Sequence, residues 1–190
     1  MSDGPHKSLP MRKAWKRVAE EADTEAFSPE EIVPRVVKAL SDDWREEVSD
    51  DQLRALRTYL ADSDQLPLFS EQRTEMRERL RHEAAGRPLG LTLIECVEKA
   101  LARGLSGEAA LEAAALAALS MHVTRGIRQV EEHYLREASA PRANSVRQKA
   151  ESAAGICQLD ALARRLIGLD GGPSPHRAEK KDGLDDGVPL

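Results

Sequence analysis

The stretch from Ser106 to Ala138 constrains the fold most strongly, because it has the pattern of one uninterrupted helix. No proline follows until Pro141, and apolar or small residues recur three or four positions apart. At about 1.5 Å per residue such a helix is about 48 Å long, and Ser106 suits its N-cap. Alanine dominates the first half, so neighbouring helices can approach closely there. We therefore predict a long central helix surrounded by others.

The composition favours an all-α fold with an aliphatic core. Apolar residues make up 41% of the chain but aromatic residues only 3%, and charged residues reach 32%. A helical spacing of apolar residues is visible almost throughout, and no alternating strand pattern is bounded by a hairpin turn. We predict an irregular bundle of six to eight helices around the 106–138 helix. Its helices are expected at about 10–22, 28–40, 51–61, 71–85, 91–103, 106–138, 141–154 and 157–167, with a short turn of helix over about 41–48.

Helix start and stop signals mark several of these boundaries. Ser28, followed by Pro29 and by Glu31 at the third helical position, has the pattern of a capping box. Ser70 is a second expected N-cap, and Gly104 is expected to end the 91–103 helix. These signals predict a single helical domain over residues 8–168. Residues 1–7 are expected to be an N-terminal tail and residues 169–190, rich in Gly, Pro and charge, a disordered one.

The sequence favours a protein of the cytoplasm without a bound metal or cofactor. No apolar run approaches the roughly 20 residues that cross a bilayer, and the N-terminus lacks the apolar region of a signal peptide. Cys96 and Cys157 lie inside helical patterns and form no CxxC pair, and the five histidines are scattered. No Glu-x-x-His pattern occurs, and there is no Gly-rich phosphate loop. His122 lies on the apolar stripe and is expected to be a partly buried, hydrogen-bonded histidine.

The segment Gln65-Leu66-Pro67-Leu68-Phe69 contains the most specific motif of the chain. It resembles the pentapeptide, Gln-Leu-x-Leu-Phe, by which bacterial replication and repair proteins bind the DNA polymerase sliding clamp. The resemblance covers these five residues only. It implies that Gln65 binds a polar notch while the apolar side chains of Leu66, Leu68 and Phe69 fill a groove. Pro67 favours an extended conformation at Leu66, which lowers the ordering cost of binding.

The alternative for this segment is that its apolar side chains pin the loop to the bundle. A hydrophobic staple would pair Phe69, one residue before the N-cap, with an apolar residue at the fourth helical position. That position is Thr74, which is polar, so this local role is poorly supported. We therefore expect Leu68 and Phe69 to be substantially exposed.

A second motif points to a different class of function. Arg128 and His133 fit the loose R-x4-H pattern and resemble the pair that HEPN ribonucleases, which are all-α proteins, use at phosphate. The resemblance implies a guanidinium that binds phosphate and an imidazole that transfers a proton. However, side chains five residues apart on one helix differ in direction by about 140°. The alternative is a solvated face on which Arg128 pairs with Glu132.

The region from Arg125 to Lys149 holds six Arg and Lys against three Glu. Such a surface can face phosphates, but it lacks interleaved aromatic residues and the net charge of the chain is −5. Direct binding to nucleic acid is therefore weakly supported.

We expect a non-enzymatic interaction protein of bacterial DNA replication or repair that binds the sliding clamp as an accessory factor or an inhibitor. A HEPN-like ribonuclease and a helical subunit of a larger assembly are the alternatives.

Overall fold

The computed structural model of the protein describes residues 11–24 and 27–170, and these form eight α-helices without a strand. The predicted all-α fold is therefore confirmed. The helices are α1 (Lys13–Thr24), α2 (Pro29–Glu47), α3 (Asp50–Ser63), α4 (Glu71–Glu83), α5 (Pro88–Ala102), α6 (Gly107–Arg136), α7 (Ala140–Ile156) and α8 (Leu159–Leu166).

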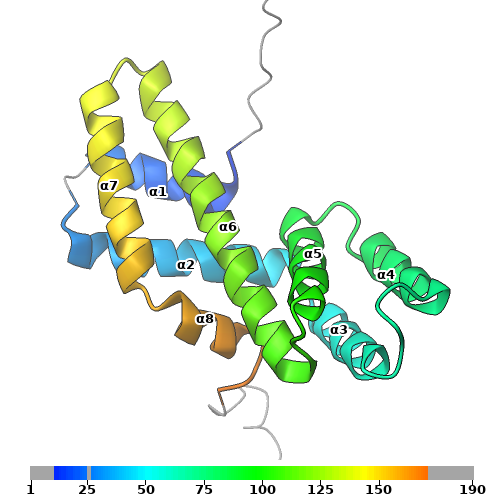
Figure 1. The fold of residues 1–190 in the computed structure, drawn as a ribbon. Helices are drawn as coiled ribbons and strands as arrows, with labels where there is room; N and C mark the ends of the chain where they lie inside the picture. The colour runs from blue at the N-terminus through cyan, green and yellow to red at the C-terminus, as the bar shows by residue number, and fades with distance from the viewer. Residues whose placement is uncertain (1–10, 25–26, 171–190) are drawn as a thin grey trace, which may run out of the picture.

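The long helix α6 runs through the middle of the molecule and packs on α1, α2, α3, α5, α7 and α8 (Figure 1). Its small residues Ala110, Ala114, Ala115 and Ala118 are fully buried. Other helices of the chain thus cover this side of the alanine-rich half, while Ala109 and Ala117 on the other side are exposed. α3, α4 and α5 form one end of the molecule, and α4 is the outermost of the three (Figure 1).

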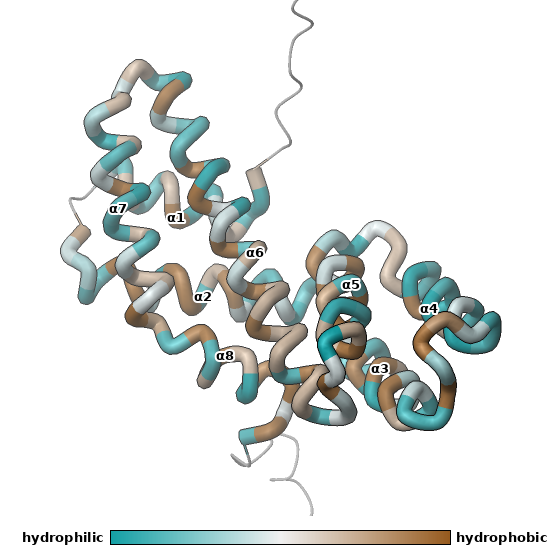
Figure 2. Tube along the Cα trace, viewed as in Figure 1, coloured by the Kyte–Doolittle hydropathy of each residue, from teal (hydrophilic) through white to brown (hydrophobic). Residues whose placement is uncertain are grey.

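One contiguous hydrophobic cluster joins the helices. Most of its members are Leu, Ala, Val and Ile, as the composition predicts, while Trp15, Tyr59 and Tyr134 are its largest fully buried side chains. α4 contributes least, because Leu80 is its only buried apolar residue and its surface is largely hydrophilic (Figure 2). Among the described residues, no helix has the length and apolar character needed to cross a membrane.

The predicted N-caps Ser28 and Ser70 are present, and Ser49 forms a third that was not predicted. The backbone N–H of Ser28 donates to Glu31 at 2.7 Å, and this hydrogen bond lowers the pKa of the Glu31 carboxyl. Ser49 and Ser70 cap α3 and α4 by accepting hydrogen bonds from backbone N–H groups three residues ahead. Ser106 also precedes its helix, but its side chain makes no capping hydrogen bond.

Two predicted helix boundaries are wrong, and both coincide with residues that disfavour the interior of a helix. Asp42 and Asp43 do not start a separate segment, because α2 continues without interruption to Glu47. α5 begins at Pro88, not at residue 91, so Gly90 lies inside the helix. Gln52 of α3 occupies the space beside Gly90, where a Cβ would come within 2.9 Å of its Nε2 atom. Tertiary packing therefore explains a glycine that local propensity would place in a loop.

The ends of the later helices follow from backbone conformation. Gly104, with a φ of 84°, ends α5 as predicted. Gln158, with a φ of 51°, separates α7 from α8, which requires a left-handed conformation at a non-glycine residue. Leu169 packs on the core, one residue beyond the predicted domain end at residue 168. The tail predicted at 1–7 and nearly all of the tail predicted at 169–190 lie outside the described residues.

Candidate functional site

The motif at residues 65–69 forms most of the loop between α3 and α4. Turns shape this loop: the N–H of Leu66 donates to the carbonyl of Ser63 at 3.3 Å, and that of Ser70 donates to the carbonyl of Pro67 at 3.1 Å. The segment is therefore folded into turns. The clamp motif requires an extended segment, and this one is not extended along its whole length. Adopting the extended form means opening the Pro67–Ser70 turn.

The aromatic ring of the motif faces solvent. Phe69 is 92% exposed, the largest value among the exposed large apolar side chains, and Leu68 is 38% exposed. Gln65 is exposed as well, while Leu66 is half-buried. Gln65 and Leu66 line a cavity of about 340 Å³ together with Asp62 and with Gln72, Glu75 and Met76 of α4. Phe69 thus does not contribute to the hydrophobic core, and Leu68 contributes little to it.

A buried polar chain holds the base of this loop. Arg73, in the first turn of α4, is buried and donates from Nε to the Tyr59 hydroxyl at 3.2 Å, while that hydroxyl donates to Glu98 of α5. Burial raises the pKa of Tyr59, and the hydrogen bond to Glu98 raises it further. Ser70 caps the same turn by accepting from the Arg73 N–H at 3.2 Å. The C-terminal end of the loop is therefore held at the start of α4, while the apolar side chains of Leu68 and Phe69 remain exposed.

The Arg128 and His133 pair does not converge within the chain. α6 is continuous through both residues, which leaves their side chains about 140° apart around the helix axis. Arg128 is exposed, whereas His133 lies 3.4 Å from Asp23 of α1 and makes an edge contact with the Tyr134 ring. The imidazole is thus used in a contact between α1 and α6.

Three of the six cations of the predicted basic stretch are paired with neighbouring acids. Arg147 contacts Glu131 at 3.2 Å and Glu151 at 3.0 Å, and Arg136 contacts Glu132 at 4.0 Å. Arg142 lies 3.8 Å from Asp23. The Arg147–Glu131 pair joins α6 to α7, and the Arg142–Asp23 pair joins α7 to α1. These ion pairs neutralise half of the cations of this stretch, which reduces the positive charge that a phosphate backbone could use.

A buried charge network, which the sequence reasoning missed, lies between α1, α2 and α6. His122 is buried, as expected, and its Nε2 atom lies 2.6 Å from Oδ2 of Asp43. Nε2 also faces the indole N–H of Trp15 at 3.4 Å, but it cannot donate to one and accept from the other. The shorter contact to the Asp43 carboxylate is the stronger one, which favours a proton on Nε2.

Two further members extend this network to α5. Arg12 lies 3.6 Å from Asp43 and forms an ion pair with Glu47, which is buried at the end of α2. The other carboxylate oxygen of Glu47 accepts the N–H of Leu89 and so caps α5, whose own N-cap residue, Arg87, provides no side-chain cap. The sequence signal was present: Asp43 and Glu47 continue the apolar stripe of α2 that runs through Val36 and Leu40.

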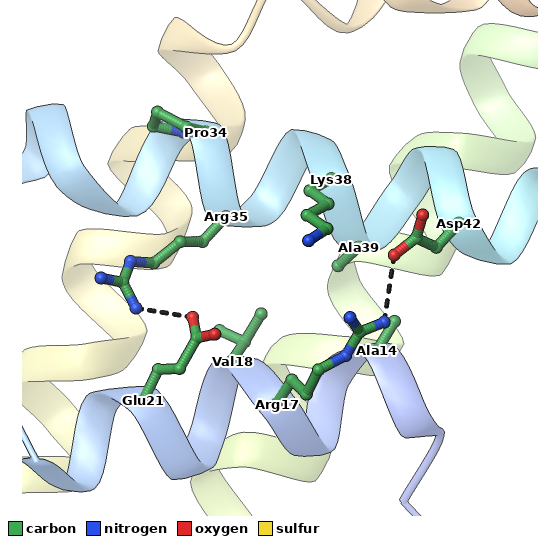
Figure 3. Close-up of a pocket in the computed structure, with 9 residues that line it drawn as sticks. All are labelled: Ala14, Arg17, Val18, Glu21, Pro34, Arg35, Lys38, Ala39 and Asp42. Carbon is green, nitrogen blue, oxygen red and sulfur yellow. Dashed lines mark hydrogen bonds and ion pairs between the residues drawn. The ribbon is translucent and has the colours of Figure 1, made fainter.

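A shallow cavity of about 270 Å³ separates α1 from α2 (Figure 3). Arg17 contacts Asp42 at 3.0 Å and Arg35 contacts Glu21 at 2.6 Å, and Lys38 lies between these two pairs. The lining holds three cations and two carboxylates, and both ion pairs are partly exposed, which makes each pair worth about 0–1 kcal/mol. We interpret this cavity as a solvent-filled gap between α1 and α2 that is bridged by ion pairs.

Neither metal nor thiol chemistry is suggested by the described part of the chain. It contains no group of three or more His, Cys, Asp or Glu residues that could hold a metal ion. Cys96 and Cys157 are both buried, and burial raises the pKa of both thiols, which disfavours the reactive thiolate.

No protein family model, curated protein or solved structure matches this chain. Its function is therefore inferred from its own residues and geometry.

Proposed function

We propose that this chain is a non-enzymatic interaction protein that binds the DNA polymerase sliding clamp of bacteria through residues 65–69, as an accessory factor or an inhibitor. The observation that carries the proposal is the 92% exposure of Phe69, which immediately precedes the Ser70 N-cap of α4. A large aromatic side chain in water offers apolar area at low entropic cost, the usual property of an interface anchor.

The contacts around the motif support a division of roles within the loop. Phe69 and Leu68 are the side chains free to enter an apolar groove, and the exposed Gln65 is free to form a hydrogen bond. Docking in the extended form requires opening the Pro67–Ser70 turn, which is held by one backbone hydrogen bond. That costs about 1 kcal/mol, a small part of the roughly 8 kcal/mol of a micromolar complex.

The geometry supports the ribonuclease alternative less well. A nuclease of that kind requires Arg128 and His133 to act at one phosphate, and in this chain they lie on different sides of α6. The imidazole is moreover engaged with Asp23 and Tyr134.

The test is direct binding of the full chain to a purified bacterial sliding clamp, measured by calorimetry. We expect a dissociation constant of about 1 μM, because a single short motif anchors few side chains. The Leu68→Ala/Phe69→Ala double variant should weaken binding by at least about 100-fold, and Gln65→Ala by less.

The matched control is Ile156→Ala, which removes another exposed apolar side chain, 59% exposed, at the end of α7. It should bind the clamp as the unchanged protein does. Equal affinity of the double variant and the control would contradict the proposal, as would the absence of any binding by the unchanged chain.

A further inference from the structure

A cavity of about 530 Å³ lies where α1 and α5 begin and where α2 ends, against one face of α6. It is distinct from the 65–69 loop and larger than the cavity between α1 and α2. A volume in this range suits a small organic ligand. Its lining residues are Met11, Arg12, Lys13, Trp15, Glu46, Pro88, His122, Arg125, Gly126 and Gln129.

The floor of the cavity is closely packed and held in place by charge. Trp15 is buried against Gly126, and its indole N–H faces His122, whose partner is Asp43. Arg12 is committed to the buried carboxylates of Asp43 and Glu47, so its charge is neutralised within the fold. A ligand would therefore find a floor that is already formed, which lowers the ordering cost of binding.

The rim carries cations that the fold does not neutralise. Lys13 and Arg125 are exposed and form no ion pair within the described residues; Arg125 donates only to the Thr92 hydroxyl, at 3.3 Å. Lys13 is also the first residue of α1, whose first turn holds no acidic side chain. The exposed Glu46 is the one carboxylate among the lining residues. The two rim cations favour a ligand with a negative charge.

The wall formed by α6 offers a buried acceptor. Oε1 of Gln129 is inaccessible to solvent and has no hydrogen-bond partner among the described residues. A buried polar atom without a partner costs about 1–3 kcal/mol, which a ligand that donates a hydrogen bond would recover once the Gln129 side chain rotates to present Oε1 to the cavity. Met11 and Pro88 add apolar surface to the lining. The cavity thus combines apolar surface, two free cations and one unsatisfied acceptor.

We propose that this cavity binds a small organic anion with a flat apolar body and one hydrogen-bond donor. The anionic group faces Lys13 and Arg125, the apolar body lies between Met11 and Pro88 above Trp15, and the donor reaches Gln129.

The probe is 1-anilinonaphthalene-8-sulfonate, which has two aromatic groups, a sulfonate and one N–H group. We expect saturable binding of one probe per chain and a melting temperature that rises with probe concentration, since a ligand selective for the native state stabilises it. The Lys13→Glu/Arg125→Glu double variant should bind at least about tenfold more weakly, equivalent to about 1.4 kcal/mol.

The control is Lys16→Glu/Arg128→Glu, the same charge change on the same two helices at residues that do not line the cavity. It should change affinity by less than about twofold, within about 0.4 kcal/mol. A third variant, Gln129→Leu, removes the acceptor. It should weaken binding of the anilino probe but not binding of naphthalene-1-sulfonate, which has no N–H to donate.

Three results would overturn the proposal. The first is no saturable binding, and the second is equal weakening by the cavity and control double variants. The third is a melting temperature that falls with probe concentration, because the probe would then prefer the unfolded chain.

Discussion

The indole ring of Trp15 lies directly against the backbone of Gly126. A Cβ built on that glycine would come within 2.0 Å of Cε2 of the indole, whereas carbon atoms in contact normally lie about 3.5–4 Å apart. α1 therefore packs on α6 through a residue without a side chain. The same contact aims the indole N–H at His122 and forms the floor of the 530 Å³ cavity.

Gly126→Ala should destabilise the protein although alanine is the better helix former. Moving Trp15 out of its packed position costs about 1–3 kcal/mol, more than the roughly 1 kcal/mol that helix propensity returns. Denaturant unfolding followed by circular dichroism measures the difference. The matched control is Gly155→Ala in α7, where an added Cβ meets nothing within 4 Å and stability should rise. Equal stabilisation by the two substitutions would show that the indole does not require this glycine.

Asp43→Asn should lower the free energy of unfolding by about 2–4 kcal/mol, because it removes the negative charge that faces His122 and Arg12 in a buried site. The neighbouring Asp42→Asn is the control. Asp42 pairs with Arg17 at the partly exposed edge of the α1–α2 cavity, where an ion pair is worth about 0–1 kcal/mol. Denaturant titration of both variants tests the difference, and a similar loss in the two would contradict the buried network.

Leu68→Ala/Phe69→Ala should leave the free energy of unfolding within about 0.5 kcal/mol of the unchanged protein, because Phe69 has little to lose in the core. In contrast, Leu56→Ala in α3 removes a fully buried side chain close by in sequence and should cost about 2–5 kcal/mol. Thermal and denaturant unfolding compare the two. A loss of several kcal/mol in the loop variant would mean that these side chains belong to the core, and the clamp proposal would lose its support.

The two tyrosines should ionise at a higher pH in the native protein than in the unfolded chain. Burial, reinforced by Asp23, raises the pKa of Tyr134 to about 12, and burial also raises the pKa of Tyr59. Ultraviolet titration of Tyr59→Phe, which leaves Tyr134 as the one tyrosine, should give a midpoint near pH 12.

The same shift predicts how stability depends on pH. An unfolded tyrosine ionises near pH 10, so the contribution of Tyr134 is fully present below pH 10 and is lost as pH rises towards 12. Tyr134→Phe should therefore flatten this alkaline decline. A tyrosine midpoint near pH 10 in folded Tyr59→Phe protein would contradict the burial of the hydroxyl against the Ala19 carbonyl.

The helical class and most helix positions could be predicted from local sequence. The capping residues Ser28 and Ser70, the terminator Gly104 and the spacing of apolar residues along 106–138 are local signals, and each acts over one or two turns. The start of α5, which was predicted at residue 91, lies where distant residues replace the local signal. Glu47 caps α5 from the end of α2, and Gln52 packs over Gly90 inside that helix.

By itself the sequence determined that the chain is helical, that a long alanine-rich helix could lie at its centre, and that a clamp-like pentapeptide stands between two helices. Only the tertiary structure decided how far Phe69 is exposed, that His133 faces Asp23 of α1, and that Asp43, His122 and Trp15 meet beside Gly126. The physical reason is the separation along the sequence over which each interaction acts. Capping and helical periodicity depend on residues a few positions apart, whereas burial and charge pairing depend on which helices become neighbours in space.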